Sequence, residues 1–144
     1  MKIVIDAYAW IEHFIGSEKG RKVKEIMENA DEVYTPDTVL AEIARKYVRE
    51  GNEDKTVKAR LEEITGISHI THIDPNLAVE GARCYLELAD KARKAKQDVP
   101  SLFDAIVLAT GRSLKSKIAT GDEHFRNLPE TVWIGRNKTD VDVK

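Results

Sequence analysis

The stretch KIVIDAYAW (residues 2–10) decides the fold. The β-branched residues Ile3, Val4 and Ile5 predict a buried strand, and an apolar helical pattern starts shortly afterwards. Asp6 stands exactly between the two elements. Because an isolated charge at the end of a buried strand is costly, this carboxylate needs a partner. The candidate partners are a helix N-terminus, a base or a metal ion.

Further along the chain, strand patterns alternate with helical patterns. This alternation predicts an α/β fold: one domain over residues 1–144, with a mostly parallel four- to five-stranded sheet and helices on both faces. Residues 136–144 are expected to form a C-terminal tail or an edge extension. The further expected strands are 32–35, 67–73, 117–120 and 131–135, and the expected helices are 7–14, 21–30 after a Ser17 cap, 38–50 after an Asp37 cap, 53–65 ending at Gly66, 75–94 after Asp74, and 102–114.

Composition limits the classes of function. The chain has 144 residues and a formal net charge of −2, so any binding of nucleic acid must depend on local groups of cations. No run of eighteen apolar residues and no signal segment is visible, and we therefore expect a cytoplasmic protein without a membrane span. Cys84 is the single cysteine, which excludes an internal disulfide.

Two acidic residues follow strands that are expected to be parallel. In such sheets, ligands bind beyond the carboxyl ends of the strands, where the strand order reverses. Asp6 ends the first strand, and Asp122 follows the fourth strand after one glycine. Asp104 is the one polar residue in LFDAIVLA (102–109), and Glu42 lies at the flank of an apolar helical stripe.

Each acid has a local explanation. Asp6 and Asp122 are typical cap or turn residues, Asp104 completes a capping box with Ser101, and Glu42 fits a half-solvated helix face. The functional hypothesis depends on the whole set. Four carboxylates in one cleft must either become protonated or bind cations. Oxygen ligands favour Mg²⁺ or Mn²⁺, and such a site is typical of metal-assisted phosphodiester hydrolysis.

Four segments carry a resemblance to a known family: IVIDAYAWIEHF, TVLAEIARKY, SLFDAIVLATGRSL and IATGDEHF. The chain resembles PIN-domain proteins of the VapC toxin type over nearly all of its length. The resemblance implies an endoribonuclease whose catalytic and metal-binding residues are Asp6, Glu42, Asp104 and Asp122. It also implies an RNA substrate, a cognate antitoxin and a homodimer or higher homo-oligomer.

Residues around the acids follow the family pattern in part. Thr120 stands at the usual position of a hydroxyl that supports the metal site. Tyr8 stands where many relatives carry Ser or Thr, and its phenol either supports the site or is a core aromatic side chain. Further candidates for RNA contacts are Arg45, Arg49, Arg112 and His124.

Two alternatives remain at the level of sequence. One is a non-catalytic interaction protein that keeps the acids as caps, and the other is a housekeeping RNA-processing nuclease on the same fold. The basic run KARKAK (91–96) closes a long helix, where cations interact favourably with the helix dipole. The RNA that is cleaved cannot be identified from these residues.

Overall fold

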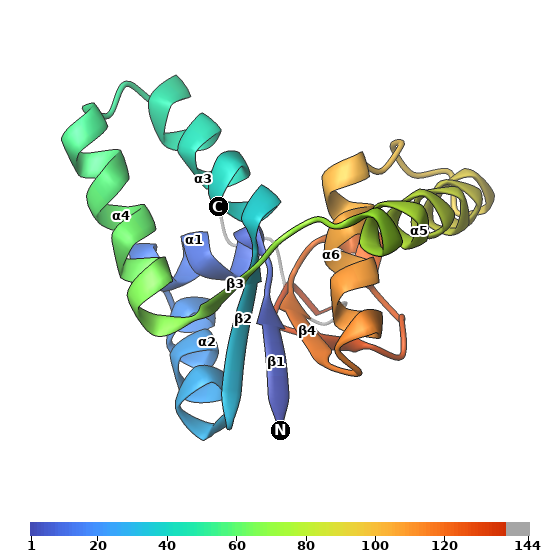
Figure 1. Cartoon of the computed structure of the whole chain (residues 1–144), viewed down its shortest axis with the longest axis horizontal. Coiled ribbons are helices and arrows are strands. Elements are labelled where there is room, and N and C mark those ends of the chain that lie inside the picture. Colours follow the sequence, from blue (N-terminus) through green and yellow to red (C-terminus); the bar gives the residue numbers. More distant parts are fainter. Residues whose placement is uncertain (138–144) are drawn as a thin grey trace.

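The computed structural model describes residues 1–137 and contains one five-stranded sheet in the order β3-β2-β1-β4-β5 (Figure 1). Every neighbouring pair of strands is parallel, which confirms the predicted α/β class and the mostly parallel sheet. The elements in chain order are β1 Lys2–Ile5, α1 Ala7–Ile15, α2 Glu18–Asn29, β2 Glu32–Pro36, α3 Asp37–Arg49, α4 Asp54–Ile67, β3 His69–Thr71, α5 Pro75–Lys94, α6 Leu102–Ser113, β4 Lys117–Thr120, the 3-10 turn η1 Glu123–Phe125, and β5 Thr131–Trp133.

The strand order reverses beside the central strand. After β1, the chain adds β2 and β3 on one side of it, then crosses over and adds β4 and β5 on the other. The carboxyl ends of β1 and β4 therefore lie side by side, with Ile5 paired to Ala119. This is the position at which open parallel sheets bind their ligands.

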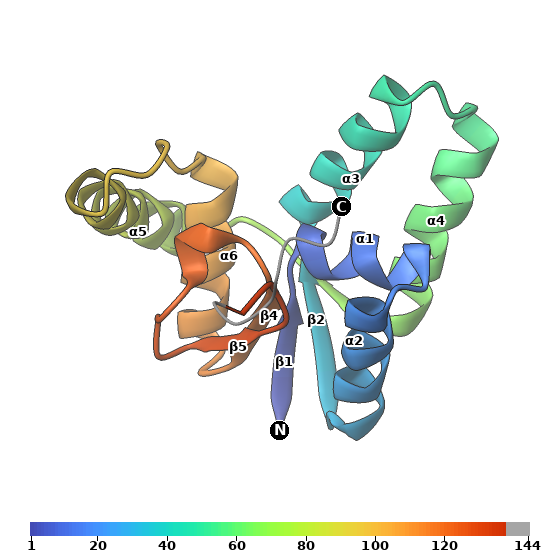
Figure 2. The same ribbon diagram turned by 180° about the vertical axis from the view of Figure 1, so that it is seen from behind.

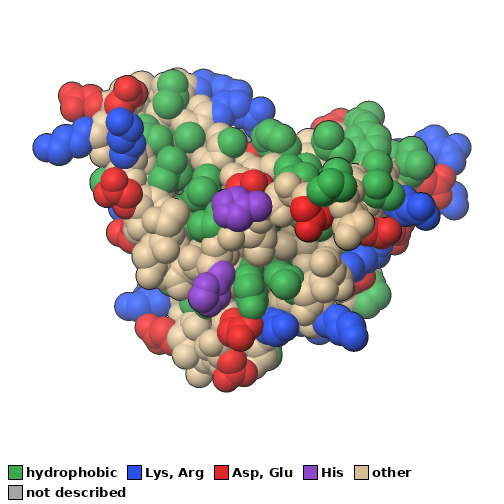
Figure 3. Space-filling view, in the orientation of Figure 1, with side chains coloured by type: hydrophobic (Ala, Val, Ile, Leu, Met, Phe, Trp, Pro, Cys, Tyr) green, Lys and Arg blue, Asp and Glu red, His purple; other side chains and the backbone are tan. Residues whose placement is uncertain are grey.

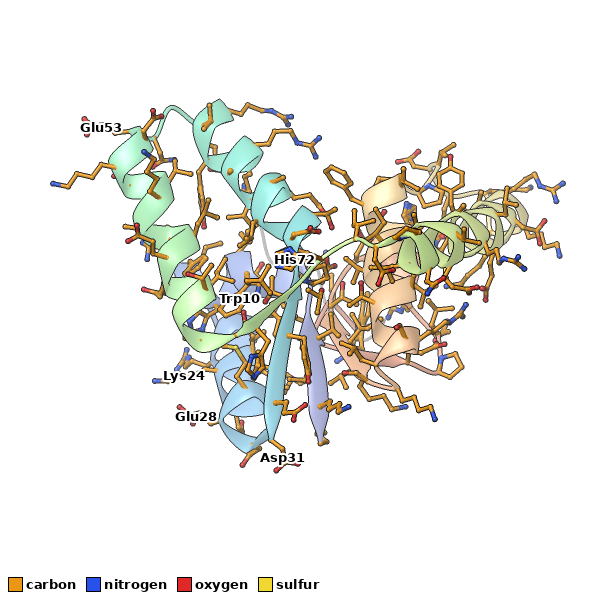
Figure 4. The ribbon with its side chains drawn as sticks, in the orientation of Figure 1. Trp10, Lys24, Glu28, Asp31, Glu53 and His72 are labelled. Atoms are coloured by element: carbon orange, nitrogen blue, oxygen red, sulfur yellow. The ribbon has the colours of Figure 1, made fainter. Side chains whose placement is uncertain are left out.

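Helices cover the sheet on both faces, as Figures 1 and 2 show. One layer contains α1, α2 and α4, and the other contains α5 and α6. Trp10 of α1 is fully buried against the sheet (Figure 4), and its indole N–H donates to the Thr35 hydroxyl of β2 at 3.1 Å. On the opposite face, α6 is buried from Asp104 to Gly111, which explains its almost continuous apolar sequence.

Several predicted boundaries are wrong. The helix expected from residue 21 begins at Glu18, and the strand expected over residues 67–73 is only His69–Thr71. Asp37 is the first residue of α3 rather than its cap, because Pro36 occupies the cap position and β2 runs directly into the helix. Gly66 does not end α4, which continues to Ile67. A helical glycine costs about 1 kcal/mol relative to alanine, and this helix accommodates that cost. The predicted caps Ser17 and Asp74 are confirmed by side-chain hydrogen bonds to Gly20 and Leu77.

The predicted tail or edge extension, residues 136–144, lies mostly outside the described residues, which end at 137. Within residues 1–137, no helix is both long and apolar enough to cross a lipid bilayer. Cys84 is buried in α5, and burial raises the pKa of its thiol.

Candidate active site

Asp6 lies at the junction of β1 and α1 and is only 3% exposed. Its two carboxylate oxygens have separate partners: Oδ1 accepts from the Ala7 N–H at 2.7 Å, and Oδ2 accepts from the Thr120 hydroxyl at 2.8 Å. The first bond makes Asp6 the N-cap of α1, as the local explanation predicted. The second joins the end of β1 to the end of β4.

Thr120 links two of the acidic residues. Its hydroxyl donates to Asp6 and accepts from the backbone N–H of Asp122 at 3.0 Å, and the residue is completely buried. A hydroxyl in this position fixes the turn that follows β4. The structure thus places Thr120 where a supporting residue of the site was predicted.

Asp104 and Asp122 each cap a helical element with one oxygen. Asp104 Oδ2 accepts from the Ser101 N–H at 3.0 Å, which completes the predicted capping box at the start of α6. Asp122 Oδ1 accepts from the His124 N–H at 2.8 Å at the start of η1. These caps hold the two side chains in place at the same edge of the sheet.

Glu42 of α3 lies close enough to the three aspartates that burial and the charges of Asp6, Asp104 and Asp122 raise its pKa. Its Oε1 atom is buried and has no hydrogen-bond partner in the described part of the chain. A buried polar atom without a partner is costly, and it indicates a site for a ligand that supplies the missing interaction. Glu42 is half-buried, as its predicted position at the flank of the apolar stripe implies, but that position does not account for the unpartnered Oε1 atom.

The four acids interact electrostatically. Burial, together with the charges of Asp104 and Asp122, raises the pKa of Asp6 to about 7. Burial, together with the charges of Asp6 and Asp104, raises the pKa of Glu42 to about 8. The pKa of Asp104 is also raised, by burial and by the charge of Asp122. The acid cluster, which we define as Asp6, Glu42, Asp104 and Asp122, therefore concentrates like charges at one edge of the sheet.

The donor set of the acid cluster consists of carboxylate oxygens, the ligands preferred by Mg²⁺ and Mn²⁺. Among residues 1–137, however, no three carboxylate, imidazole or thiol side chains already stand in an arrangement that would hold a metal ion. Both oxygens of Asp6 are engaged in hydrogen bonds, whereas Glu42 Oε1 has no partner. The cluster thus fits a divalent cation in its chemistry and in its unpartnered oxygen, and its side chains would need to rotate to bind one.

The predicted neighbours of the acids divide into two groups. His124 lies at the site, because its charge lowers the pKa of Asp104, and its buried Nδ1 has no partner among the described residues. Arg45 is also close, because its charge opposes the rise in the pKa of Glu42. Arg49 is exposed at the far end of α3.

Arg112 lies elsewhere. It stands at the carboxyl end of α6, eight residues beyond Asp104, or about 12 Å along the helix axis at roughly 1.5 Å per residue. Its guanidinium donates to Glu87 at 2.6 and 3.0 Å and to Glu130 at 2.7 Å. The structure therefore does not bring Arg112 to the acid cluster.

Tyr8 is half-buried and its hydroxyl is bound to a cation. The Lys19 ammonium donates to the Tyr8 oxygen at 2.9 Å. The Tyr8 ring packs so closely on Gly121 that a Cβ atom there would approach the ring to 2.3 Å. Tyr8 thus forms part of the wall beside Asp122.

Two residues of the site were missed in the sequence. Thr38 is 9% exposed, its hydroxyl has no partner in the described chain, and it lies one helical turn before Glu42 on the same face of α3. The i, i+4 spacing to an acid was the available signal. Lys91 donates to the backbone carbonyls of His124 and Arg126 at 3.2 and 2.6 Å, and so holds η1 against α5. Nothing in its sequence distinguished Lys91 from the other cations that close α5.

Comparison with known proteins gives one family and a consistent set of folds. The family model described as PIN domain matches residues 3–130. The structure is similar to a toxin-antitoxin complex from Klebsiella pneumoniae, with a TM-score of 0.65, 18% identity, and coverage of 92% of this chain and 97% of that chain. No curated protein sequence matches significantly.

Two further solved structures share the fold. VapBC2 from Rickettsia felis, bound to a DNA fragment from its promoter, has a TM-score of 0.67 and 11% identity, and the match covers 95% of this chain and 100% of that chain. VapC20 from Mycobacterium tuberculosis, described as a sarcin-ricin loop cleaving toxin, has a TM-score of 0.64 and 19% identity, with coverage of 85% and 92%. At these identities, the likeness shows the fold.

Proposed function

Because this chain belongs to the PIN domain family, we propose that it is a metal-dependent endoribonuclease and the toxin of a toxin–antitoxin pair. The observation that carries the proposal is the acid cluster. Segments that are far apart in the sequence bring four carboxylates to the edge of the sheet where the strand order reverses, and Glu42 presents a buried oxygen without a partner. One of the similar structures is a toxin that cleaves RNA, which supports this choice of substrate.

Asp6, Glu42, Asp104 and Asp122 would hold the Mg²⁺ or Mn²⁺. A divalent ion at such a site supplies Lewis acidity toward a phosphodiester and lowers the pKa of bound water. Thr120 orients Asp6 through its hydroxyl, and the capping bonds of Asp104 and Asp122 keep these carboxylates at the site. The protein thereby positions a group of carboxylates that becomes compatible with a phosphate only when a cation is bound.

His124 and Arg45 are the best-placed residues for contact with RNA near the acids, and Arg49 would act further along α3. We assign Arg112 a structural role instead, because both of its acidic partners belong to this chain.

Two partners complete the proposal. Similar structures are described as a toxin-antitoxin complex and as VapBC bound to DNA, which supports a cognate antitoxin protein as the partner. Apolar side chains gather over α5 and α6 in Figure 3, and Leu86 and Leu102 are 70% and 53% exposed there. An exposed apolar face of this kind supports a homodimer or higher homo-oligomer.

The test is the variant Asp104→Asn. Asparagine keeps an acceptor for the Ser101 N–H but removes the negative charge. We expect cleavage of a fluorescent single-stranded RNA in Mg²⁺ or Mn²⁺ to fall by at least about 100-fold, since loss of residues that merely orient metal ligands already costs about 10- to 100-fold. EDTA should abolish wild-type cleavage.

The matched control is Asp74→Asn. Asp74 is also a helix cap but lies outside the acid cluster, at the start of α5. This variant should cleave RNA at the wild-type rate. Unchanged cleavage by Asp104→Asn, or equal losses in both variants, would refute the proposed nuclease site.

A further inference from the structure

A cavity of about 540 Å³ lies between the first half of α2 and the segment that follows β5. We call it the α2 pocket. It is lined by the cations Lys19, Arg21 and Lys22, by the carboxylates Glu18 and Glu25, and by Gly135 among others. Cations therefore outnumber carboxylates in a protein that has a formal net charge of −2.

Lys19, Arg21 and Lys22 form no ion pair in the described part of the chain. The ion pairs formed by Lys and Arg within residues 1–137 involve other side chains. Lys19 donates to the Tyr8 hydroxyl at 2.9 Å, and Lys22 donates to the Trp133 carbonyl at 3.1 Å. The hydrogen bond to Tyr8 raises the pKa of Lys19, so this side chain is charged at neutral pH.

The α2 pocket is joined to the acid cluster through close contacts. Tyr8 follows Asp6 by two residues, and its ring lies against Gly121, the residue before Asp122. Gly135 lies beside the same position, because its Cα would be 2.8 Å from a Cβ built at Gly121. Tyr8, Gly121 and Gly135 thus form one continuous wall from the acids to the cations.

An RNA chain that is cleaved at the acid cluster carries negatively charged phosphates on both sides of the cleaved bond. The acid cluster itself repels them, so the affinity of a polyanion must come from cations nearby. Positively charged grooves that follow the backbone are the usual means of binding single-stranded nucleic acid. The α2 pocket offers such cations directly beside the site.

We propose that the α2 pocket binds the phosphate backbone of single-stranded RNA next to the bond that is cleaved at the acid cluster, with Arg21 and Lys22 as the main contacts. This inference rests on the proposed ribonuclease function and adds a path for the substrate to it. Lys19 has the additional role of holding Tyr8 at the junction of the pocket and the acids.

The experiment measures binding of a fluorescent, unstructured oligouridylate in EDTA, where no cleavage is expected, over a series of KCl concentrations. Arg21→Gln combined with Lys22→Gln should weaken binding and make the plot of log K against log [KCl] shallower by about 1.4, because each phosphate contact on a single strand contributes roughly 0.7. Arg21→Gln alone should reduce the slope by about 0.7. In Mg²⁺ or Mn²⁺, the double variant should raise KM for RNA more than it lowers kcat.

The matched control is Lys55→Gln combined with Lys58→Gln. These two residues are exposed on α4, away from the α2 pocket, and should leave the salt slope unchanged. Thermal unfolding of each variant checks that the fold is retained.

The outcomes separate the two proposals. A wild-type protein that does not cleave RNA in either metal refutes the proposed function. Cleavage by the wild type together with an unchanged salt slope and KM in the Arg21/Lys22 variant overturns only the α2 pocket. Polyglutamate serves as a second probe, which represents acidic protein segments. If the Arg21/Lys22 variant binds RNA like the wild type but no longer binds polyglutamate, the assignment of the α2 pocket to RNA is overturned.

Discussion

The two ends of α6 carry different arrangements of charged groups. At its amino end, Asp104 joins three other acids, and the pKa of each affected group in the cluster is raised. At its carboxyl end, Arg112 binds Glu87 and Glu130, and its hydrogen bonds lower the pKa of Glu87. One end concentrates charges of the same sign, whereas the other pairs charges of opposite sign.

The difference separates charges that stabilise the fold from charges that we propose to bind a cation. The Arg112 group connects α6 to α5 and to the turn before β5, so it stabilises the arrangement of these elements. The acid cluster destabilises the fold unless protons or a cation from outside neutralise part of its charge. A fold that keeps such a cluster accepts a loss of stability at one edge of the sheet.

The largest effect that tests this contrast is the pH dependence of stability without metal. Asp6 and Glu42 have folded-state pKa values of about 7 and about 8, above the values near 4 expected in the unfolded chain. Between these pH values the folded state binds more protons, so stability decreases as the pH rises from about 4 to about 8. Each pKa unit corresponds to about 1.4 kcal/mol, and the pKa of each group is raised by roughly three to four such units. We therefore expect a loss of at least about 4 kcal/mol in EDTA from these groups, or roughly 8–16 °C in Tm by calorimetry.

The double variant Asp6→Asn and Glu42→Gln provides the comparison. Without the two titrating carboxyl groups, its Tm should decrease less between pH 5 and pH 8, and added Mn²⁺ should stabilise it less than it stabilises the wild type. For the wild type, stabilisation by Mn²⁺ should be greater at pH 8 than at pH 6, because the ion displaces protons. Parallel Tm profiles of the wild type and the double variant would contradict the contrast between the two ends of α6.

The second effect concerns the carboxyl end of α6, where Arg112 is paired with two glutamates. Arg112→Met keeps the apolar stem but leaves Glu87 and Glu130 without their cation. Because the guanidinium is partly exposed, we expect the free energy of unfolding to fall by only about 1–2 kcal/mol. Urea denaturation measures this loss, and RNA cleavage below the unfolding range should keep its wild-type rate. A large loss of cleavage in the folded variant would mean that Arg112 contacts substrate, as the sequence suggested.

Topology predicted part of the acid cluster, and the family resemblance implied the full set of four acids. Parallel strands place Asp6 and Asp122 at a common edge, and the buried helix leaves Asp104 as its one polar side chain. Arg112 was assigned to RNA because it shares a helix with Asp104, but position on a helix does not say at which end of the sheet a side chain lies. Its partners Glu87 and Glu130 belong to elements whose packing the sequence pattern does not specify.

At the level of sequence, the capping explanations and the functional hypothesis are alternatives, but the structure shows that the two are compatible. Asp6, Asp104 and Asp122 do cap helical elements, and the same bonds hold their carboxylates at one edge of the sheet. Glu42 shows the limit of sequence reasoning, because its buried oxygen without a partner results from how α3 packs against the sheet. The burial of the unpartnered Thr38 hydroxyl results from the same packing.

The smallest effect concerns α5, which contacts Arg112 at one end of α6 and the η1 turn that follows Asp122. On α5, Glu87 binds Arg112, and Lys91, one turn later, donates to the carbonyls of His124 and Arg126. Lys91→Met removes both hydrogen bonds. We expect a loss of about 1 kcal/mol in stability and about a 10-fold fall in RNA cleavage, since η1 helps to position Asp122. Lys94→Met, which removes only an exposed ion pair with Asp90, should change stability by less than about 0.5 kcal/mol and leave cleavage intact. Wild-type cleavage by Lys91→Met would show that η1 keeps its position without α5, and that the acid cluster does not depend on the paired charges around it.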